Sequence, residues 1–291
     1  MASTQDIRRR IKSIRNIGQL TKAMQMVAAS KMRKAQQLAL AGRPYATLMN
    51  RVLVSLRART DPKLHPLLHV RPLKKELVIV ISTDKGLAGA LNTNLLREAA
   101  RFETDKTGYV ASGRKARQFL ARTRREMLAD FELKDAPKFV ETKAISKFCT
   151  EKFLSGEVDK VSVLYTHFVN TINQRPVVRT LLPITEFRLL PKEGTAAEER
   201  AEDPMVGYVF EPNEEVVLDI MLPYYIQYQV FQMILDARAS EHSARMVAMK
   251  NATDNAQQFI KDLTLEYNKM RQAAITTELL EISTAQMAVG A

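Results

Sequence analysis

The stretch from Tyr224 to Val289 contains neither glycine nor proline and constrains the fold more than any other part of the sequence. Its apolar and small residues recur in steps of three and four, first along Ile226, Val230, Met233, Ala237, Ser240, Ala244 and Val247, then, after an irregularity near Asn251, along Ala252, Ala256, Phe259, Leu263, Tyr267, Met270, Ala274 and Thr277. A spacing near 3.5 residues predicts a helix with a narrow seam for one partner helix. At 1.5 Å per residue, this helix would be roughly 100 Å long.

A second long helix is predicted at the other end of the chain, from Thr4 to about Arg57. Its apolar positions start at Ile7, Ile11 and Ile14, shift register, and continue through Ile17, Leu20, Met24, Val27, Met32, Ala35, Leu38, Tyr45, Met49, Val52 and Leu56. Pro44 is expected to kink this helix, because proline removes a backbone donor and crowds the preceding turn. Two terminal helices with apolar seams favour an antiparallel coiled coil over two separate core helices.

The middle of the chain alternates short apolar runs with helical segments. The continuous run Leu77–Ile81 is typical of a strand that is buried on both faces. Further strands are predicted near 109–111, 126–131, 161–165 and 177–190, and helices at 92–103, from 115 and at 137–154. This alternation predicts a Rossmann-like α/β domain with a mostly parallel sheet and helices on both faces.

These patterns divide the chain into three parts. Residues 1–60 form the first helix of the coiled coil, residues 61–213 form the central α/β domain, and residues 214–291 contain the C-terminal helix. Residues 191–215 are interpreted as an acidic loop, and Pro223 is expected to interrupt the helical pattern before the long final helix begins.

The positive charge is concentrated in the first helix. Residues 1–60 contain 13 Lys and Arg and one acid, Asp6, a net charge of 13 − 1 = +12. The other residues contain 44 − 13 = 31 basic and 32 − 1 = 31 acidic side chains, so their net charge is zero. A basic block of this kind indicates an anionic partner, which can be a nucleic acid, an anionic lipid or an acidic protein surface.

No motif in the sequence predicts catalysis, a cofactor or a metal site. Gly86-Leu-Ala-Gly89 lacks the third glycine and the acidic partner of a dinucleotide-binding loop, and Gly108 to Lys115 lacks the Lys-Ser/Thr pair of a phosphate-binding loop. Tight turns explain these glycines better. The single cysteine, Cys149, excludes an intrachain disulfide and a cysteine-based zinc site.

Three segments resemble the γ subunit of F-type ATP synthases of the bacterial type. Residues 17–34 read IGQLTKAMQMVAASKMRK, residues 82–92 read STDKGLAGALN, and residues 241–281 include ARMVAMKNATDNA and YNKMRQAAITTELLE. The resemblance spans the whole chain in the family's order. The middle motif departs from the family at Lys85, where Arg is usual, and at Ala88, where many members have Cys.

The resemblance implies the central rotor shaft of the ATP synthase, a non-catalytic subunit that couples proton-driven rotation of the membrane ring to ATP synthesis, or the reverse. The implied partners are the α and β subunits, the ε subunit and the c-subunit ring, without nucleic acid. The implied location is the cytoplasmic face of the bacterial plasma membrane, as a peripheral protein.

The resemblance also assigns contact residues. Those expected to contact the β subunits are Lys22, Met24, Lys31, Arg33, Lys34, Arg245, Arg271, Gln272, Thr276 and Glu278. Those expected to contact the ring or ε are Tyr208, Phe210 and Glu211. The apolar end from Ile282 to Val289 is expected to turn inside the hexamer.

A nucleic-acid-binding coiled coil is the alternative that the basic helix leaves open. It predicts affinity for duplex that falls steeply with salt, and it leaves the α/β domain without a role.

Overall fold

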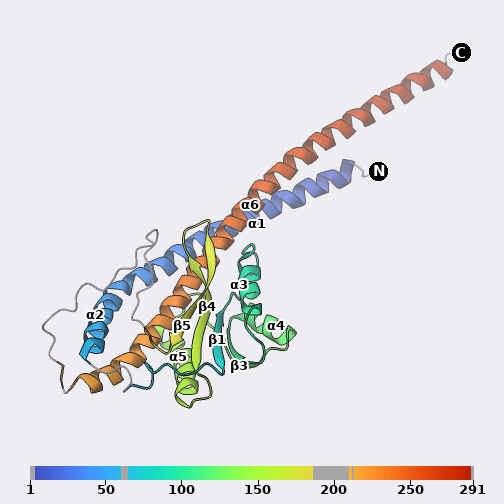
Figure 1. Ribbon diagram of the computed structural model, residues 1–291. Helices are drawn as coiled ribbons and strands as arrows, with labels where there is room; N and C mark the ends of the chain where they lie inside the picture. Colours follow the sequence, from blue (N-terminus) through green and yellow to red (C-terminus); the bar gives the residue numbers. More distant parts are fainter. Residues whose placement is uncertain (1–3, 60–64, 186–209, 212, 290–291) are drawn as a thin grey trace. The chain divides into compact units, whose positions relative to one another are not determined.

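The computed structural model describes residues 4–59, 65–185, 210–211 and 213–289 (Figure 1). In chain order, its elements are α1 (Thr4–Ala41), α2 (Arg43–Arg59), β1 (Glu76–Ile81), α3 (Leu91–Ala100), β2 (Thr107–Ser112), α4 (Arg114–Arg122), β3 (Met127–Phe131), α5 (Phe139–Leu154), β4 (Lys160–Phe168), β5 (Gln174–Leu182) and α6 (Glu214–Val289).

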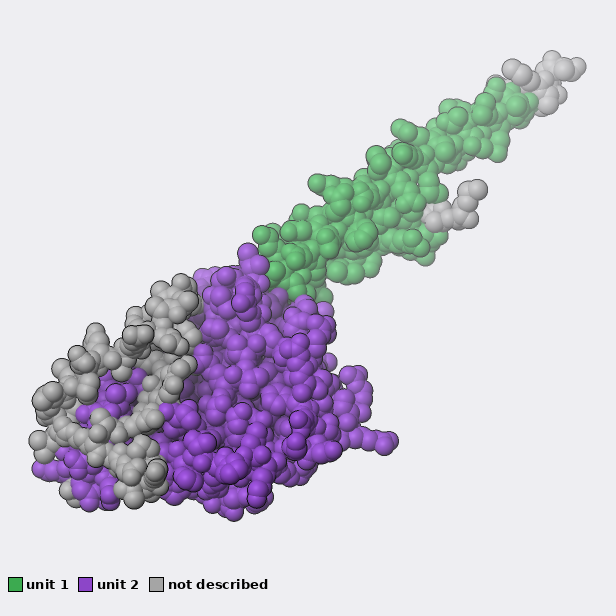
Figure 2. Space-filling view, in the orientation of Figure 1, with its two compact units in different colours: residues 1–27, 246–291 green, residues 28–245 purple. Residues whose placement is uncertain are grey.

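The chain forms two compact units (Figure 2). Unit 1 comprises residues 1–27 and 246–291, and unit 2 comprises residues 28–245. Helices α1 and α6 each have residues in both units. The boundaries between the units therefore fall within the terminal helices, whereas the three parts predicted from the sequence each contained a terminal helix in full or none of it.

Unit 2 contains a five-stranded sheet in the order β3-β2-β1-β4-β5. The pairs β1–β2, β1–β4 and β2–β3 are parallel, and β4–β5 is antiparallel. This arrangement confirms the expected α/β class with a mostly parallel sheet. The fifth strand begins at Gln174, three residues before the predicted start, and ends at Leu182, while residues 186–190 of the predicted strand lie outside the described part of the chain.

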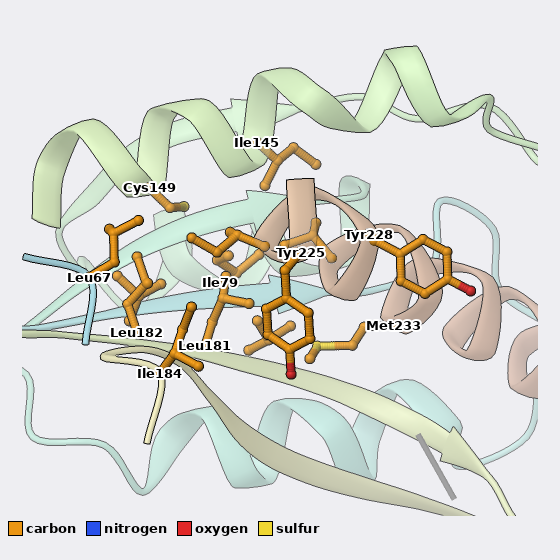
Figure 3. Packing of buried hydrophobic residues seen from close by; sticks show 14 of the residues in the cluster. Leu67, Ile79, Ile145, Cys149, Leu181, Leu182, Ile184, Tyr225, Tyr228 and Met233 are labelled. Carbon is orange, nitrogen blue, oxygen red and sulfur yellow. The ribbon is translucent and has the colours of Figure 1, made fainter. Parts of the chain in front are cut away.

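The central strands β1, β2 and β4 are almost wholly buried. Since successive side chains of a strand point to opposite sides, both faces of the sheet are covered there. On one face, Leu77, Ile79 and Ile81 of β1 pack with α2, α5 and the part of α6 between Leu218 and Ala237. Figure 3 shows this cluster, with Ile145 and Cys149 of α5 near Ile79 and with Tyr225 and Met233 contributed by α6.

The opposite face of the sheet is covered by α3 and α4. Val78 and Val80 of β1 pack there with Leu95 and Ala99 of α3, and Ala116 and Leu120 of α4 complete the layer. The helix residues recur four positions apart, so each helix presents one apolar stripe to the sheet. The sheet therefore lies between two helical layers, as the alternating sequence pattern predicted.

The first helical segment breaks at Gly42 and not at Pro44, so the kink was predicted two residues too late. A side chain at Gly42 would collide with α6, since a methyl carbon built there lies 2.7 Å from the hydroxyl of Tyr228. That hydroxyl donates a 2.8 Å hydrogen bond to the Gly42 carbonyl. Pro44 is in the first turn of α2, where its missing N–H costs nothing because the first N–H groups of a helix are unpaired.

The prediction that Pro223 interrupts the C-terminal helix is wrong, because α6 begins at Glu214 and continues through Pro223. Proline in a helix interior costs about 3 kcal/mol. The adjacent residues Leu218, Leu222 and Ile226 are all buried in the core cluster. Their packing on the sheet outweighs the local preference for a break.

Candidate functional site

The paired helices of unit 1 are antiparallel. The hydroxyls of Thr21 on α1 and Thr253 on α6 are 2.7 Å apart and buried. Three residues earlier on α1, Gly18 faces Ala256, which is three residues later on α6. Contacts that move in opposite directions along the two helices confirm the expected antiparallel coiled coil.

The seam of α1 differs from the predicted one. Buried and half-buried positions follow one uninterrupted series without a register shift: Thr4, Ile7, Ile11, Ile14, Gly18, Thr21, Gln25, Ala28, Met32 and Ala35. Ile17, Leu20 and Val27, which were predicted to lie on the seam, are 51%, 62% and 55% exposed. Small and hydroxyl-bearing residues occupy the seam beside them, and the larger apolar side chains face outward.

The matching seam of α6 continues through Met249, Thr253, Ala256, Ile260, Leu263, Tyr267 and Met270. Leu263, Tyr267 and Met270 were predicted correctly, whereas Phe259 is 59% exposed and its place is taken by Ile260. After Met270, every residue through Ala285 is exposed, including Ile275, Leu279 and Ile282. The contacts made by Gly18 and Thr21 each join residue numbers that sum to 274, which places Thr4, the first described residue of α1, opposite Met270.

The predicted β-subunit contacts of α1 are in different environments. Lys22, Arg33 and Lys34 are exposed, and Met24 is half-buried. Lys31 forms an ion pair with Asp135, with 2.5 Å between Nζ and Oδ2. This hydrogen bond holds the pKa of the Asp135 carboxyl below its usual value. Lys31 therefore has a partner within its own chain, and the other three basic side chains of this group, Lys22, Arg33 and Lys34, are exposed.

The predicted contact residues Arg271, Gln272, Thr276 and Glu278 are all exposed on α6. The Thr276 hydroxyl donates a 2.9 Å hydrogen bond to the Gln272 carbonyl, one turn earlier. They belong to the part of α6 that lies beyond Met270.

Arg245, another predicted contact, is only 9% exposed and belongs to an internal network. Its guanidinium donates to the carbonyl oxygens of Lys85 and Gly86 at 3.2–3.3 Å and to a carboxylate oxygen of Glu241 at 2.8 Å. The resemblance predicts that Arg245 contacts a β subunit. In this chain its guanidinium donates hydrogen bonds to carbonyls of the loop that follows β1.

Glu241 connects Arg245 to a second buried arginine, which the sequence did not reveal. Its other carboxylate oxygen accepts a 2.7 Å hydrogen bond from Arg238. Arg238 also donates to the carbonyl of Leu133 at 3.1 Å and lies 3.6 Å from the Asp84 carboxylate. The available signal was the Arg-x-x-Glu-x-x-x-Arg spacing at 238–245, which puts all three residues on one helical face.

Burial also affects the titration of this network. His242 is 2% exposed, and desolvation is the main cause that lowers its pKa to about 4. The nearby charges of Glu241, Arg245, Asp135 and Lys31 modify this effect in both directions. His242 is therefore neutral at physiological pH.

The residues predicted to contact the ring or ε fall only partly within the described chain. Phe210 is half-buried against the core cluster of unit 2, and Glu211 is exposed. Tyr208 and most of the predicted acidic loop lie outside the described residues.

The glycines near the sheet were predicted to serve turns, and this is wrong for Gly108, which lies within β2, where a Cβ would be 2.9 Å from Cδ1 of Leu128. Gly89 and Gly113 lie outside the strands with positive φ. Gly113 has φ +101°, and a side chain there would place Cβ 2.4 Å from the Ser82 carbonyl oxygen. Gly89 has φ +58°. Among the described residues no group of three His, Cys, Asp or Glu is arranged to hold a metal ion. Cys149 is fully buried, and its burial raises the pKa of the thiol to about 12.

Comparison with known proteins identifies the family. The family model described as "ATP synthase" matches residues 3–289, and a curated protein 52% identical over 295 residues, with full coverage of both chains, is the ATP synthase gamma chain of Methylacidiphilum infernorum. The chain belongs to the ATP synthase gamma-chain family. The gamma chain of Opitutus terrae is 50% identical over 99% of both chains. The family resemblance seen in the sequence is confirmed.

Solved structures have the same fold. The chain is similar to a chain of the Tetrahymena thermophila mitochondrial ATP synthase central stalk and c-ring, with a TM-score of 0.62, 27% identity, and coverage of 80% of this chain and 99% of the other. A chain of the Euglena gracilis mitochondrial ATP synthase rotor matches with a TM-score of 0.66 and 19% identity over 94% of this chain and 98% of the other, which supports the fold alone. None of this chain's described helices combines the length and hydrophobicity of a membrane span.

Proposed function

We propose that this chain is the central rotor shaft of a bacterial F-type ATP synthase. It couples proton-driven rotation of the membrane ring to ATP synthesis, or the reverse, at sites that belong to the β subunits, and it performs no bond chemistry itself. Its partners in this role are the α and β subunits, the ε subunit and the c-subunit ring, at the cytoplasmic face of the plasma membrane.

The observation that carries the proposal is the continuity of α6. This single helix runs from Glu214 to Val289 and has residues in both units. In unit 2 it is buried against the sheet, and in unit 1 it pairs with α1. A single helix that is common to an α/β body and a helix pair suits the transmission of torque.

The outward apolar residues of unit 1 support the same role. Ile17, Leu20 and Val27 on α1 and Phe259 on α6 are more than half exposed although the two helices are already paired. Apolar contacts have no preferred direction, so an exposed apolar surface can contact a partner without forming ion pairs or hydrogen bonds of fixed geometry. A shaft that turns inside a hexamer requires a surface of this kind.

The contact residues are proposed in two groups. Those that remain available for β subunits are Lys22, Met24, Arg33, Lys34, Arg271, Gln272, Thr276 and Glu278, with Lys31 available only after separation from Asp135. Phe210 and Glu211, together with Tyr208, are proposed to meet the ring or ε. Partly desolvated charge pairs are strong enough to bias a moving partner.

Reconstitution tests the proposal. Purified α and β subunits are combined with this chain, and assembly and magnesium-ATP hydrolysis are measured. We expect one copy per hexamer and hydrolysis that depends on the chain, followed by rotation of a rod attached through Gln118→Cys on the exposed side of α4. The buried Cys149 does not compete for the label.

A chain that failed to join the hexamer would overturn the proposal. Binding to duplex DNA with a steep salt dependence would then favour the nucleic-acid alternative.

A further inference from the structure

Helix α6 is enclosed by protein between Asp236 and Arg245, yet this segment is polar. Arg238, Ser240, Glu241, His242 and Ser243 are each at most 3% exposed. A helix that is buried on all sides is normally apolar, and buried charges are costly unless they are paired and hydrogen-bonded. Hydrophobic packing alone does not explain this composition.

One side of the segment holds the loops at the carboxyl ends of the parallel strands. Arg245 donates to the carbonyls of Lys85 and Gly86 in the loop after β1. Arg238 donates to the Leu133 carbonyl in the loop after β3. Glu241 lies between the two arginines and accepts from both, so the arrangement is an Arg–Glu–Arg triad.

The other side of the segment holds the end of β4 and the β4–β5 hairpin. The carboxylate of Asp236 accepts a 3.0 Å hydrogen bond from the Phe168 N–H and lies 2.6 Å from Nδ1 of His167. The Ser243 hydroxyl donates a 2.9 Å hydrogen bond to the Thr171 carbonyl.

These two sets of contacts lie on nearly opposite sides of the helix. Asp236 and Arg238 are two residues apart, as are Glu241 and Ser243, and two residues correspond to about 200° of helical rotation. A rotation of α6 about its axis would separate donors from acceptors on both sides at once. The pairs of Glu241 with Arg238 and Arg245 lie within α6 and would turn with it. Arg238 would lose the Leu133 carbonyl and the Asp84 carboxylate, and Arg245 would lose the Lys85 and Gly86 carbonyls. Losing these partners in a buried region is unfavourable.

We propose that the buried polar residues from Asp236 to Arg245 lock α6 to the sheet against rotation about its own axis, with Arg238 and Ser243 as positioning residues on its two sides. Apolar contacts such as those of Ile226 and Val230 can repack after a small rotation, whereas hydrogen bonds of fixed direction cannot. The proposal rests on the proposed rotor function, in which torque must pass between the α/β body and α6.

The test uses the assembled rotor with the Gln118→Cys rod and measures the angular spread at each pause during ATP hydrolysis. The variants are Arg238→Met, Ser243→Ala and the two combined. In Arg238→Met, Glu241 is still paired with Arg245. Asp84 is already partly exposed, and it still accepts a hydrogen bond from the Arg114 N–H. Ser243→Ala removes only a hydroxyl, so it tests the proposal even if the arginine variant does not fold.

We expect hydrolysis to continue in all variants while the angular spread increases. The mean-square angular fluctuation of α6 against the sheet varies inversely with the stiffness of the contacts between them. If the two sides of α6 contribute equally, losing the contacts on one side roughly doubles the angular variance that arises there. The combined variant should have the largest spread. Arg101→Met is the matched control, because it removes the same charge from an exposed ion pair with Glu98.

A spread in Arg238→Met and Ser243→Ala equal to that of the unmodified rotor would overturn the proposal, as would an equal increase in the Arg101→Met control. Failure of the unmodified chain to support rotation would instead contradict the proposed function, so the two failures are distinguishable.

Discussion

Gly18 of α1 faces Ala256 of α6 so closely that a methyl carbon built at Gly18 lies 3.5 Å from the Cβ of Ala256. This separation is within the Cβ–Cβ range of a disulfide. The contact defines the register of the helix pair in unit 1, together with the hydrogen bond between Thr21 and Thr253.

Gly18→Cys combined with Ala256→Cys is therefore expected to form a disulfide under mild oxidation. The measurement is the mobility change on non-reducing electrophoresis, with intact mass to count free thiols. The matched control is Ile17→Cys with Ala256→Cys, because Ile17 is exposed and faces away from the seam. Faster crosslinking of the control pair would show that the predicted seam, and not the observed one, is correct.

Gly113→Ala is expected to destabilise unit 2 by about 3 kcal/mol or more, since it combines backbone strain with a buried collision. Gly113 has φ +101°, and its Cβ would lie 2.4 Å from the Ser82 carbonyl oxygen. Urea unfolding of the purified chain measures the change.

Gly89→Ala separates the two causes of that loss. Gly89 also has a positive φ, +58°, but a Cβ there meets nothing within 4 Å. Its expected cost is about 1 kcal/mol, from backbone conformation alone. Equal losses for the two variants would contradict the collision at Ser82.

Arg124→Gly is expected to stabilise the chain by about 0.5–1 kcal/mol, because glycine tolerates a left-handed conformation that costs arginine energy. Arg124 has φ +52°, and the end of α4 forms two closing hydrogen bonds, from the Arg124 N–H to the Ala121 carbonyl and from the Arg125 N–H to the Leu120 carbonyl.

The unfolding midpoint in urea measures this effect. Arg122→Gly is the control, because Arg122 is in the last turn of α4, where glycine is unfavourable, and it should destabilise. A loss of stability in Arg124→Gly would show that its side chain contributes more than its backbone costs.

Acid is expected to destabilise the chain through His242. Its pKa in the folded chain, about 4, is below the usual histidine value of 6.5, so the unfolded state binds the proton first. The stability that this group contributes is fully present above pH 6.5 and is lost as the pH falls from 6.5 towards 4. Between pH 7.5 and pH 5 the loss is about 2 kcal/mol.

Unfolding of the original chain and of His242→Gln at both pH values isolates this contribution. The variant should lose less stability over the same interval, since glutamine does not titrate. The pKa of His65 is also lowered by burial, but it is unchanged between the two proteins and cancels in the comparison. Identical acid sensitivity in both proteins would contradict the assignment.

The sequence predicted the sheet well because its strands are apolar on both faces. Leu77–Ile81 was found as a buried strand since the residues of β1 that point to either helical layer are all hydrophobic. The two terminal helices were also found, because their apolar periodicity extends over many turns.

The seam of α1 was harder to predict because apolar character does not show which partner a residue serves. Ile17, Leu20 and Val27 look like seam residues, but Gly18 and Thr21 occupy the seam and the larger side chains face outward. A periodic pattern cannot separate surface kept for another subunit from surface buried within the chain. The same ambiguity placed Phe259 on the seam in place of Ile260.

The buried network was missed for a different reason. Charged residues are assigned to solvent by default, and Arg238 and Glu241 become buried only because two loops distant in the sequence close over them. Pro223 shows the converse case, in which core packing keeps a helix intact despite a residue that normally ends it.

The exposed end of α6 has a consequence for the life of the chain before assembly. From Arg271 to Ala285 every residue is exposed, and Ile275, Leu279, Leu280 and Ile282 present apolar surface. This segment continues α6 but has no packing contacts of its own with the rest of the described chain to stabilise it, so we expect it to open locally more readily than the part of α6 paired with α1. In a free chain it is therefore the expected first site of cleavage by an added protease.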